Sequence, residues 1–63
     1  VAIGDRQFLK SMLPHHSGAI LMCARAKIED PGIKELCRNI IVGQQQEIAE
    51  MTAKLQALDK STP

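Results

Sequence analysis

A methionine and two histidines stand close together in the chain and offer donor atoms for a soft metal ion. Met12 precedes His15 by three residues and His16 by four, so all three side chains can converge on one turn of a helix. A thioether combined with imidazole suits soft or borderline ions, above all Cu(I), with Ag(I) as a mimic. The spacing therefore indicates a copper site.

Three further residues extend this group of candidate ligands. Glu47 and Met51 are four residues apart and can approach the histidines from a second helix. Met22 lies two helical turns from His15, about 10 Å along the axis, so it can share an ion with it only if a partner chain brings it in. Methionine is also a common core filler, so packing is the alternative for each thioether.

Other metals and enzymatic chemistry fit the sequence less well. Zinc sites use cysteine, histidine and carboxylate at defined spacings, and neither C-x-x-C nor H-E-x-x-H occurs. Di-iron bundles use Glu-x-x-His pairs, and no glutamate is followed three residues later by histidine. Each cysteine is at least seven positions from a histidine, so nucleophilic catalysis is not supported and we expect no enzyme.

A polar layer without metal is the alternative interpretation of the same residues. His16 and Gln44 each interrupt an otherwise apolar helical stripe, and an unsatisfied buried polar group costs about 1–3 kcal/mol. A hydrogen bond between His16 and Gln44 would satisfy both and fix the pairing of the helices, as a buried Asn does in coiled coils. A layer that only fixes pairing would not require further donor residues nearby. His15, Met12 and Met51 lie around the same turn, and their presence favours metal binding.

The elements expected to position these residues are two helices. The pattern predicts a single all-α domain over residues 1–63, with a helix over about 5–28, a turn at 29–32 and a helix over about 31–58. Asp30 is a good N-cap, and the Pro that follows it suits the first helical position. Amphipathic helices joined by so short a turn make an antiparallel hairpin.

The hairpin predicts which residues are neighbours. With the turn centred near Asp30, Cys23 faces Cys37 and His16 faces Gln44. The cysteines have three interpretations: a disulfide contributing about 3 kcal/mol, two buried thiols, or a pair of thiolates that bind copper or zinc.

Apolar surface left over on the inner face of the hairpin predicts association with a second copy. A chain of 63 residues rarely builds a sufficient core by itself. Two hairpins packed together would form a four-helix bundle, so we expect a homodimer.

Composition argues against two classes of partner. The net charge is +1, and the chain has one Phe and no Tyr or Trp, so nucleic-acid binding is not expected. The longest apolar run, 19–24, is too short for membrane insertion. The chain begins at Val1, and we expect a fragment or a processed chain whose targeting segment lies outside it.

Two motifs together resemble the domain of unknown function (DUF) family numbered 305. They are M-x-P-H-H at 12–16 and Q-x-x-E-I-x-x-M at 44–51, and the similarity extends from Asp5 to about Leu58. The resemblance implies an exported bacterial protein of ferritin-like helical-bundle architecture, in a family that includes CopM-type periplasmic copper-binding proteins. It also implies that the family's recurring His, Met and polar positions fall on Met12, His15, His16, Met22, Gln44, Glu47 and Met51.

These observations together predict a small exported protein, periplasmic or secreted, that binds Cu(I) for sequestration, storage or resistance. Its expected partners are a second copy of itself and the copper-handling proteins that deliver or receive the ion. The alternative is a non-catalytic helical dimerisation module in which the layer of His16 and Gln44 only fixes pairing.

Overall fold

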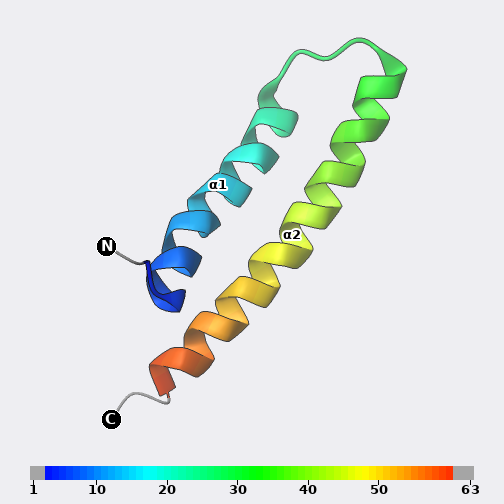
Figure 1. Ribbon diagram of the computed structural model, residues 1–63. Helices are drawn as coiled ribbons and strands as arrows, with labels where there is room; N and C mark the ends of the chain where they lie inside the picture. Colours follow the sequence, from blue (N-terminus) through cyan, green and yellow to red (C-terminus); the bar gives the residue numbers. More distant parts are fainter. Residues whose placement is uncertain (1–2, 61–63) are drawn as a thin grey trace.

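The computed structural model describes residues 3–60, which form two helices and no strand. Helix α1 spans Asp5–Arg25 and helix α2 spans Pro31–Lys60. The helices lie side by side and run in opposite directions, with the connection at one end of the molecule (Figure 1). The all-α hairpin expected from the sequence is confirmed.

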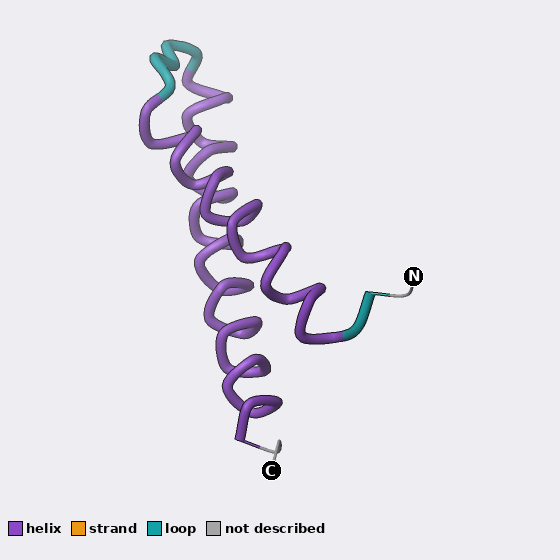
Figure 2. Tube along the Cα trace, turned by 90° about the vertical axis from the view of Figure 1, so that its left-hand side faces the viewer, coloured by secondary structure: helices purple, strands orange, loops and turns teal. Residues whose placement is uncertain are grey.

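The hairpin is long and thin, measuring 51 × 24 × 15 Å. Its smallest dimension is close to the diameter of a single helix with its side chains, about 10–12 Å. The helices are close together near the connection, and α1 leans away from α2 toward its N-terminus (Figure 2). At that open end, Arg6 Nη2 lies 2.8 Å from Asp59 Oδ1 and links the two helices.

Helix α1 ends three residues before the expected boundary near residue 28. Ala26 has extended backbone angles, φ −67° and ψ 141°, and its N–H donates to the Met22 carbonyl at 2.9 Å. The N–H of Ile28 then bonds to the Ala26 carbonyl at 3.1 Å, so the chain is already turning there. Because Asp30 precedes a proline, it is disfavoured in helical conformation, and the chain uses residues 26–30 to reverse direction.

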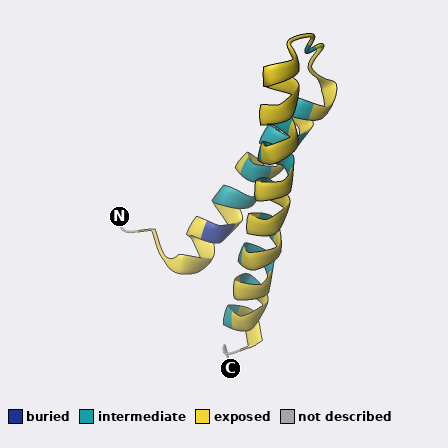
Figure 3. Ribbon diagram, turned by 90° about the vertical axis from the view of Figure 1, so that its right-hand side faces the viewer, coloured by how far each residue is buried: buried dark blue, intermediate teal, exposed yellow. Residues whose placement is uncertain are grey.

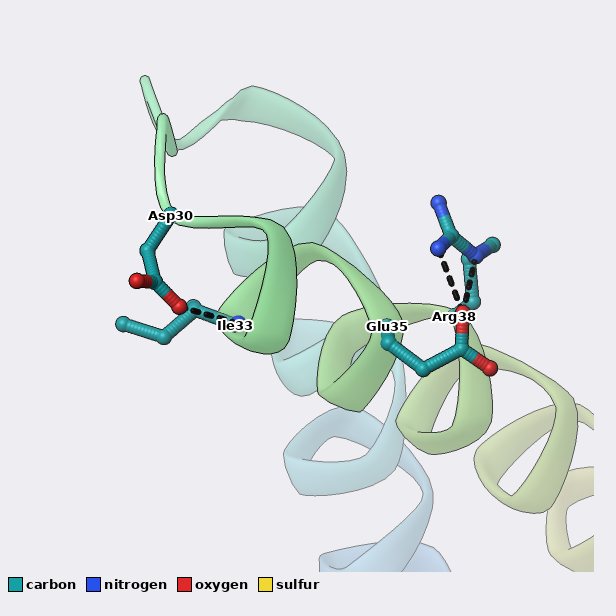
Figure 4. Close-up of polar contacts among 4 residues, drawn as sticks. All are labelled: Asp30, Ile33, Glu35 and Arg38. Carbon is teal, nitrogen blue, oxygen red and sulfur yellow. Dashed lines mark hydrogen bonds and ion pairs between the residues drawn. The ribbon is translucent and has the colours of Figure 1, made fainter.

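Helix α2 begins where the sequence predicts and runs to Lys60, two residues beyond the expected end near 58. Asp30 Oδ2 accepts a hydrogen bond from the Ile33 N–H at 2.9 Å, which is the N-cap interaction (Figure 4). A Cβ at Gly32 would lie only 3.0 Å from that Asp30 oxygen, so the glycine leaves room for the cap. In the next turn, the Arg38 guanidinium pairs with Glu35 on the exposed surface (Figure 4).

The seam between the helices excludes little water. Leu9 is the one buried hydrophobic residue among residues 3–60, with 7% of its surface exposed. The remaining seam residues stay half-buried, and they follow the line of contact between α1 and α2 (Figure 3). Large apolar side chains elsewhere face solvent, including Phe8 at 54% and Met22 at 73% exposed.

A disulfide joins Cys23 of α1 to Cys37 of α2 near the connection. Their Cα atoms are 5.4 Å apart and the sequence separation is 14 residues. Of the three interpretations of the cysteines, the structure contains the disulfide. It holds the two helices together covalently where their apolar contact alone is thin.

Removing the disulfide should destabilise the hairpin. A crosslink that closes a loop of about 15 residues contributes about 3 kcal/mol in the chain-entropy treatment. We expect the double variant Cys23→Ser, Cys37→Ser to lose about 3 kcal/mol in free energy of unfolding, measured by urea denaturation followed by circular dichroism. A dithiol reductant should lower the urea midpoint of the parent chain and leave that of the double variant unchanged. Equal midpoints for the oxidised parent and the double variant would contradict this account.

Candidate metal site between the helices

His16 is the polar residue at the centre of the seam. Its side chain is 14% exposed, and both ring nitrogens have partners. Nδ1 lies 2.9 Å from the Met12 carbonyl oxygen, and because a carbonyl only accepts, Nδ1 carries hydrogen and donates. Nε2 lies 2.6 Å from Glu47 Oε2, across the seam on α2. The backbone of α1 therefore orients the imidazole so that Nε2 is directed toward α2.

The contact between His16 and Glu47 needs a hydrogen between the two atoms. The carboxylate oxygen offers only lone pairs, and so does Nε2 when Nδ1 holds the single hydrogen of a neutral ring. At 2.6 Å the pair is attractive when a proton lies between Nε2 and Oε2, as in an imidazolium–carboxylate ion pair. A metal cation can replace that proton if the carboxylate moves back. Glu47 has room to do so, because its side chain is 56% exposed.

The expected layer of His16 and Gln44 is replaced by a pair of His16 and Glu47. The prediction placed the centre of the turn near Asp30 and so set Gln44 opposite His16. In the structure His16 pairs with Glu47, about one turn further along α2, so the register at this point differs from the register at Cys23 and Cys37. Gln44 is half-buried, and its Oε1 is buried with no hydrogen-bond partner in the described part of the chain.

Two methionines lie one helical turn from this ion pair. Met12 precedes His16 by four residues on α1, and Met51 follows Glu47 by four residues on α2; both are half-buried. Because the helices are antiparallel, both methionines lie on the same side of the pair along the rod. We call Met12, His16, Glu47 and Met51 the inner site. It combines an imidazole, a carboxylate and two thioethers.

The other two candidate ligands lie outside the inner site. His15 and Met22 are exposed, and both line an open depression on the surface of α1 together with Ser11, Pro14, Gly18, Ala19 and Leu21. Consecutive residues of a helix point about 100° apart, so His15 and His16 face different directions although they are adjacent in sequence. The structure therefore separates the six candidate ligands into an inner four and an outer two.

The direct pairing of His16 with Glu47 is a contact that the predicted register did not give. Glu47 was expected to approach the histidines as a candidate metal ligand, and in the structure its carboxylate is the direct partner of His16. A usable signal was present, since a carboxylate attracts an imidazole more strongly than an amide does. In residues 3–60 no group of three or more His, Cys, Asp or Glu side chains is placed to hold a metal ion. Neither helix within those residues has the length and apolarity needed to cross a membrane.

Comparison with known proteins places the chain in a family. Residues 3–62 match the domain of unknown function DUF305. The chain belongs to this family. It is also 47% identical over 55 residues to an uncharacterized protein of Acanthamoeba polyphaga mimivirus, an alignment that covers 84% of this chain and 36% of the viral protein.

The DUF305 assignment confirms the resemblance drawn from the M-x-P-H-H and Q-x-x-E-I-x-x-M motifs. The chain spans about a third of the length of its viral relative, at 36%. That relative gives no support to the bacterial origin that the resemblance implied. No solved structure matches the chain significantly.

Replacing Gln44 by an apolar residue of similar length should stabilise the hairpin. A buried acceptor without a partner costs about 1–3 kcal/mol, and methionine fills similar space without that acceptor. We expect Gln44→Met to raise the free energy of unfolding by about 1 kcal/mol in urea denaturation. Gln45→Met, on the exposed side of α2, is the control and should change it little. A loss of stability in Gln44→Met would mean that the amide has a partner in solution.

Proposed function

We propose that this DUF305 chain binds Cu(I), with Ag(I) as a mimic, for copper sequestration, storage or resistance. The ligands are those of the inner site: Met12, His16, Glu47 and Met51. The observation that carries the proposal is the hydrogen bond from His16 Nδ1–H to the Met12 carbonyl, 2.9 Å long. Histidines that bind metal commonly donate their second ring N–H to a carbonyl in this way, which fixes the tautomer with Nε2 free to bind the ion.

The donor set suits a soft monovalent ion. Thioether sulfur is a neutral, soft ligand that selects Cu(I), and imidazole accepts copper in either oxidation state. Glu47 supplies a carboxylate that balances the charge of the ion, since its Oε2 lies 2.6 Å from His16 Nε2. All four residues come from two helices that the disulfide holds in register, so little ordering is needed when the ion binds. The proposal is for binding without turnover.

The same proposal places the chain outside the reducing cytosol. Disulfides form and persist in oxidising compartments, and Cys23 and Cys37 are joined. With both thiols consumed, copper has to be held by thioether and imidazole, and these are the donors of the inner site. A periplasmic or secreted location, with copper-handling proteins as partners, fits this chemistry and the ferritin-like, CopM-type members that the family resemblance implied.

Dimerisation belongs to both functional hypotheses. A hairpin with one buried hydrophobic residue among residues 3–60 leaves apolar surface that a second copy can cover in a four-helix bundle. The alternative function is a dimerisation module in which polar groups only specify pairing. The buried, unpartnered Oε1 of Gln44 favours that alternative, because a second chain could supply its hydrogen bond. The two hypotheses differ in whether the seam binds a metal ion.

A titration with Ag(I) against a competing chelator, on the oxidised chain, separates them. We expect one tight site per chain, lost in His16→Ala and weakened in Met12→Leu and Met51→Leu. Loss of a residue that hydrogen-bonds to a metal ligand typically lowers metal affinity about 10- to 100-fold. Loss of a ligand itself should lower the affinity by at least that factor. Leu55→Met is the control, since it adds a thioether on the seam one turn away and should leave affinity unchanged.

Circular dichroism on each variant separates loss of a ligand from loss of the fold. If the folded parent chain fails to bind Ag(I), or if folded His16→Ala binds as tightly as the parent, the metal proposal is wrong. A change in oligomeric state alone in His16→Ala would support the dimerisation module.

A further inference from the structure

The part of α1 that lies beyond the disulfide is held on α2 by weak contacts. Leu9 is the one buried hydrophobic residue among residues 3–60. The pair of His16 with Glu47 crosses between the helices, and so does the pair of Arg6 with Asp59. In both pairs the carboxylate side chain is 56% exposed, and water screens an exposed ion pair so that it adds little to stability. These contacts alone therefore hold α1 loosely.

Helix α1 also depends on a neighbour more than α2 does. It has 21 residues, against 30 in α2, and Pro14 lies in its interior. Proline cannot donate a hydrogen bond to the carbonyl four residues earlier, and a glycine inside a helix, such as Gly18, is a further cost. Most of the stability of such a helix comes from tertiary packing. Once separated from α2, α1 should lose helical structure.

The connection between the helices does not fix α1 by itself. It leaves residues 26–30 outside both helices, and of these five only Ile28 is even half-buried. The disulfide removes the freedom that such a segment allows, because it joins the last turn of α1 to the second turn of α2. Its two Cα atoms are 5.4 Å apart. A chain this small generally needs a covalent or metal link of this kind to hold its elements together.

We propose that the Cys23–Cys37 disulfide is a redox switch: it holds α1 on α2 in oxidising surroundings, and its reduction by a dithiol releases α1 and separates His16 from Glu47. Both cysteines are half-buried and so remain accessible to a small reductant. The release of α1 stands on the contacts alone, whereas its effect on metal binding rests on the proposed function. The inner site is then assembled only after the chain has entered an oxidising compartment.

The reducing step is a thiol–disulfide exchange. A thiolate of the dithiol attacks one sulfur of the crosslink and forms a mixed disulfide, and the other protein sulfur leaves as a thiolate that takes up a proton. The second thiol of the reductant then breaks the mixed disulfide and releases the second protein thiol. The chain gains two electrons and two protons, and the reductant becomes a disulfide. Exchange with an oxidised dithiol reverses each step and closes the hairpin again.

The release of α1 is tested without metal, by NMR before and after reduction with dithiothreitol. Phe8 is the single aromatic residue besides the two histidines, so its ring signals are resolved, and it lines a pocket together with Ala57 and Leu58 of α2. In the oxidised chain we expect nuclear Overhauser effects between the Phe8 ring and the methyl groups of Ala57 and Leu58. Reduction should abolish them and move the Cα shifts of residues 5–22 toward random-coil values. Reoxidation should restore both.

The double variant Cys23→Ser, Cys37→Ser is the control for effects of the reductant itself. It should lack the Phe8 contacts under all conditions, and dithiothreitol should leave its spectrum unchanged. Phe8 contacts that persist in the reduced parent chain or in the double variant would overturn the switch. Their absence from the oxidised parent chain would do the same.

The effect on metal binding is tested with Ag(I) on the oxidised parent chain and on the same double variant, which has no thiol to bind the ion. A crosslink that closes a loop of about 15 residues changes the closed fraction of the hairpin by about 100-fold, and the apparent affinity falls with that fraction. We expect the double variant to bind Ag(I) about 10- to 100-fold more weakly. Equal affinities would overturn the coupling of the switch to the site. If the oxidised parent chain binds no Ag(I), the proposed function fails, and the Phe8 contacts still decide the switch.

Discussion

Two helices in contact along a single seam can shield few side chains from water, and the Cys23–Cys37 disulfide supplies the constraint that this seam lacks. Only Leu9 is buried in the described part of the chain, so hydrophobic burial alone contributes little to the packing of α1 against α2. The crosslink lies beside the connection and reduces the conformational entropy of the unfolded chain. It also fixes which turn of α1 faces which turn of α2 beside the connection.

A polar pair lies at the centre of the seam. His16 meets Glu47 of α2 there, and the hydrogen bond to the Met12 carbonyl orients the imidazole. In a wide, dry core an imidazole and a carboxylate would be costly to bury. Here Glu47 stays more than half exposed, at 56%, so the pair costs little and the carboxylate remains free to move. A thin seam therefore tolerates a charged side chain that a wide core would exclude.

Local signals in the sequence were sufficient for the fold but not for the site. Asp30 before Pro31 marked the start of α2, and helical spacing placed Cys23 and Cys37 on facing stripes, because capping and periodicity act over a few residues. The partner of His16 depends on how far α1 leans over a length of several turns, which no local pattern encodes. The end of α1 was placed three residues too late, at about 28, for a similar reason: the length of connection needed to reverse the chain depends on where both helices lie.

The tandem histidines face two different surfaces of α1. Adjacent residues point about 100° apart on a helix, so a pair of histidines cannot both face one neighbour. His16 belongs to the seam with α2, where Glu47 and the Met12 carbonyl hold it. His15 is exposed and lines the open depression on α1 together with Met22. Met12 is half-buried, and its carbonyl accepts the hydrogen bond from His16. Two adjacent histidines on one helix therefore place one imidazole against the neighbouring helix and the other on the exposed surface.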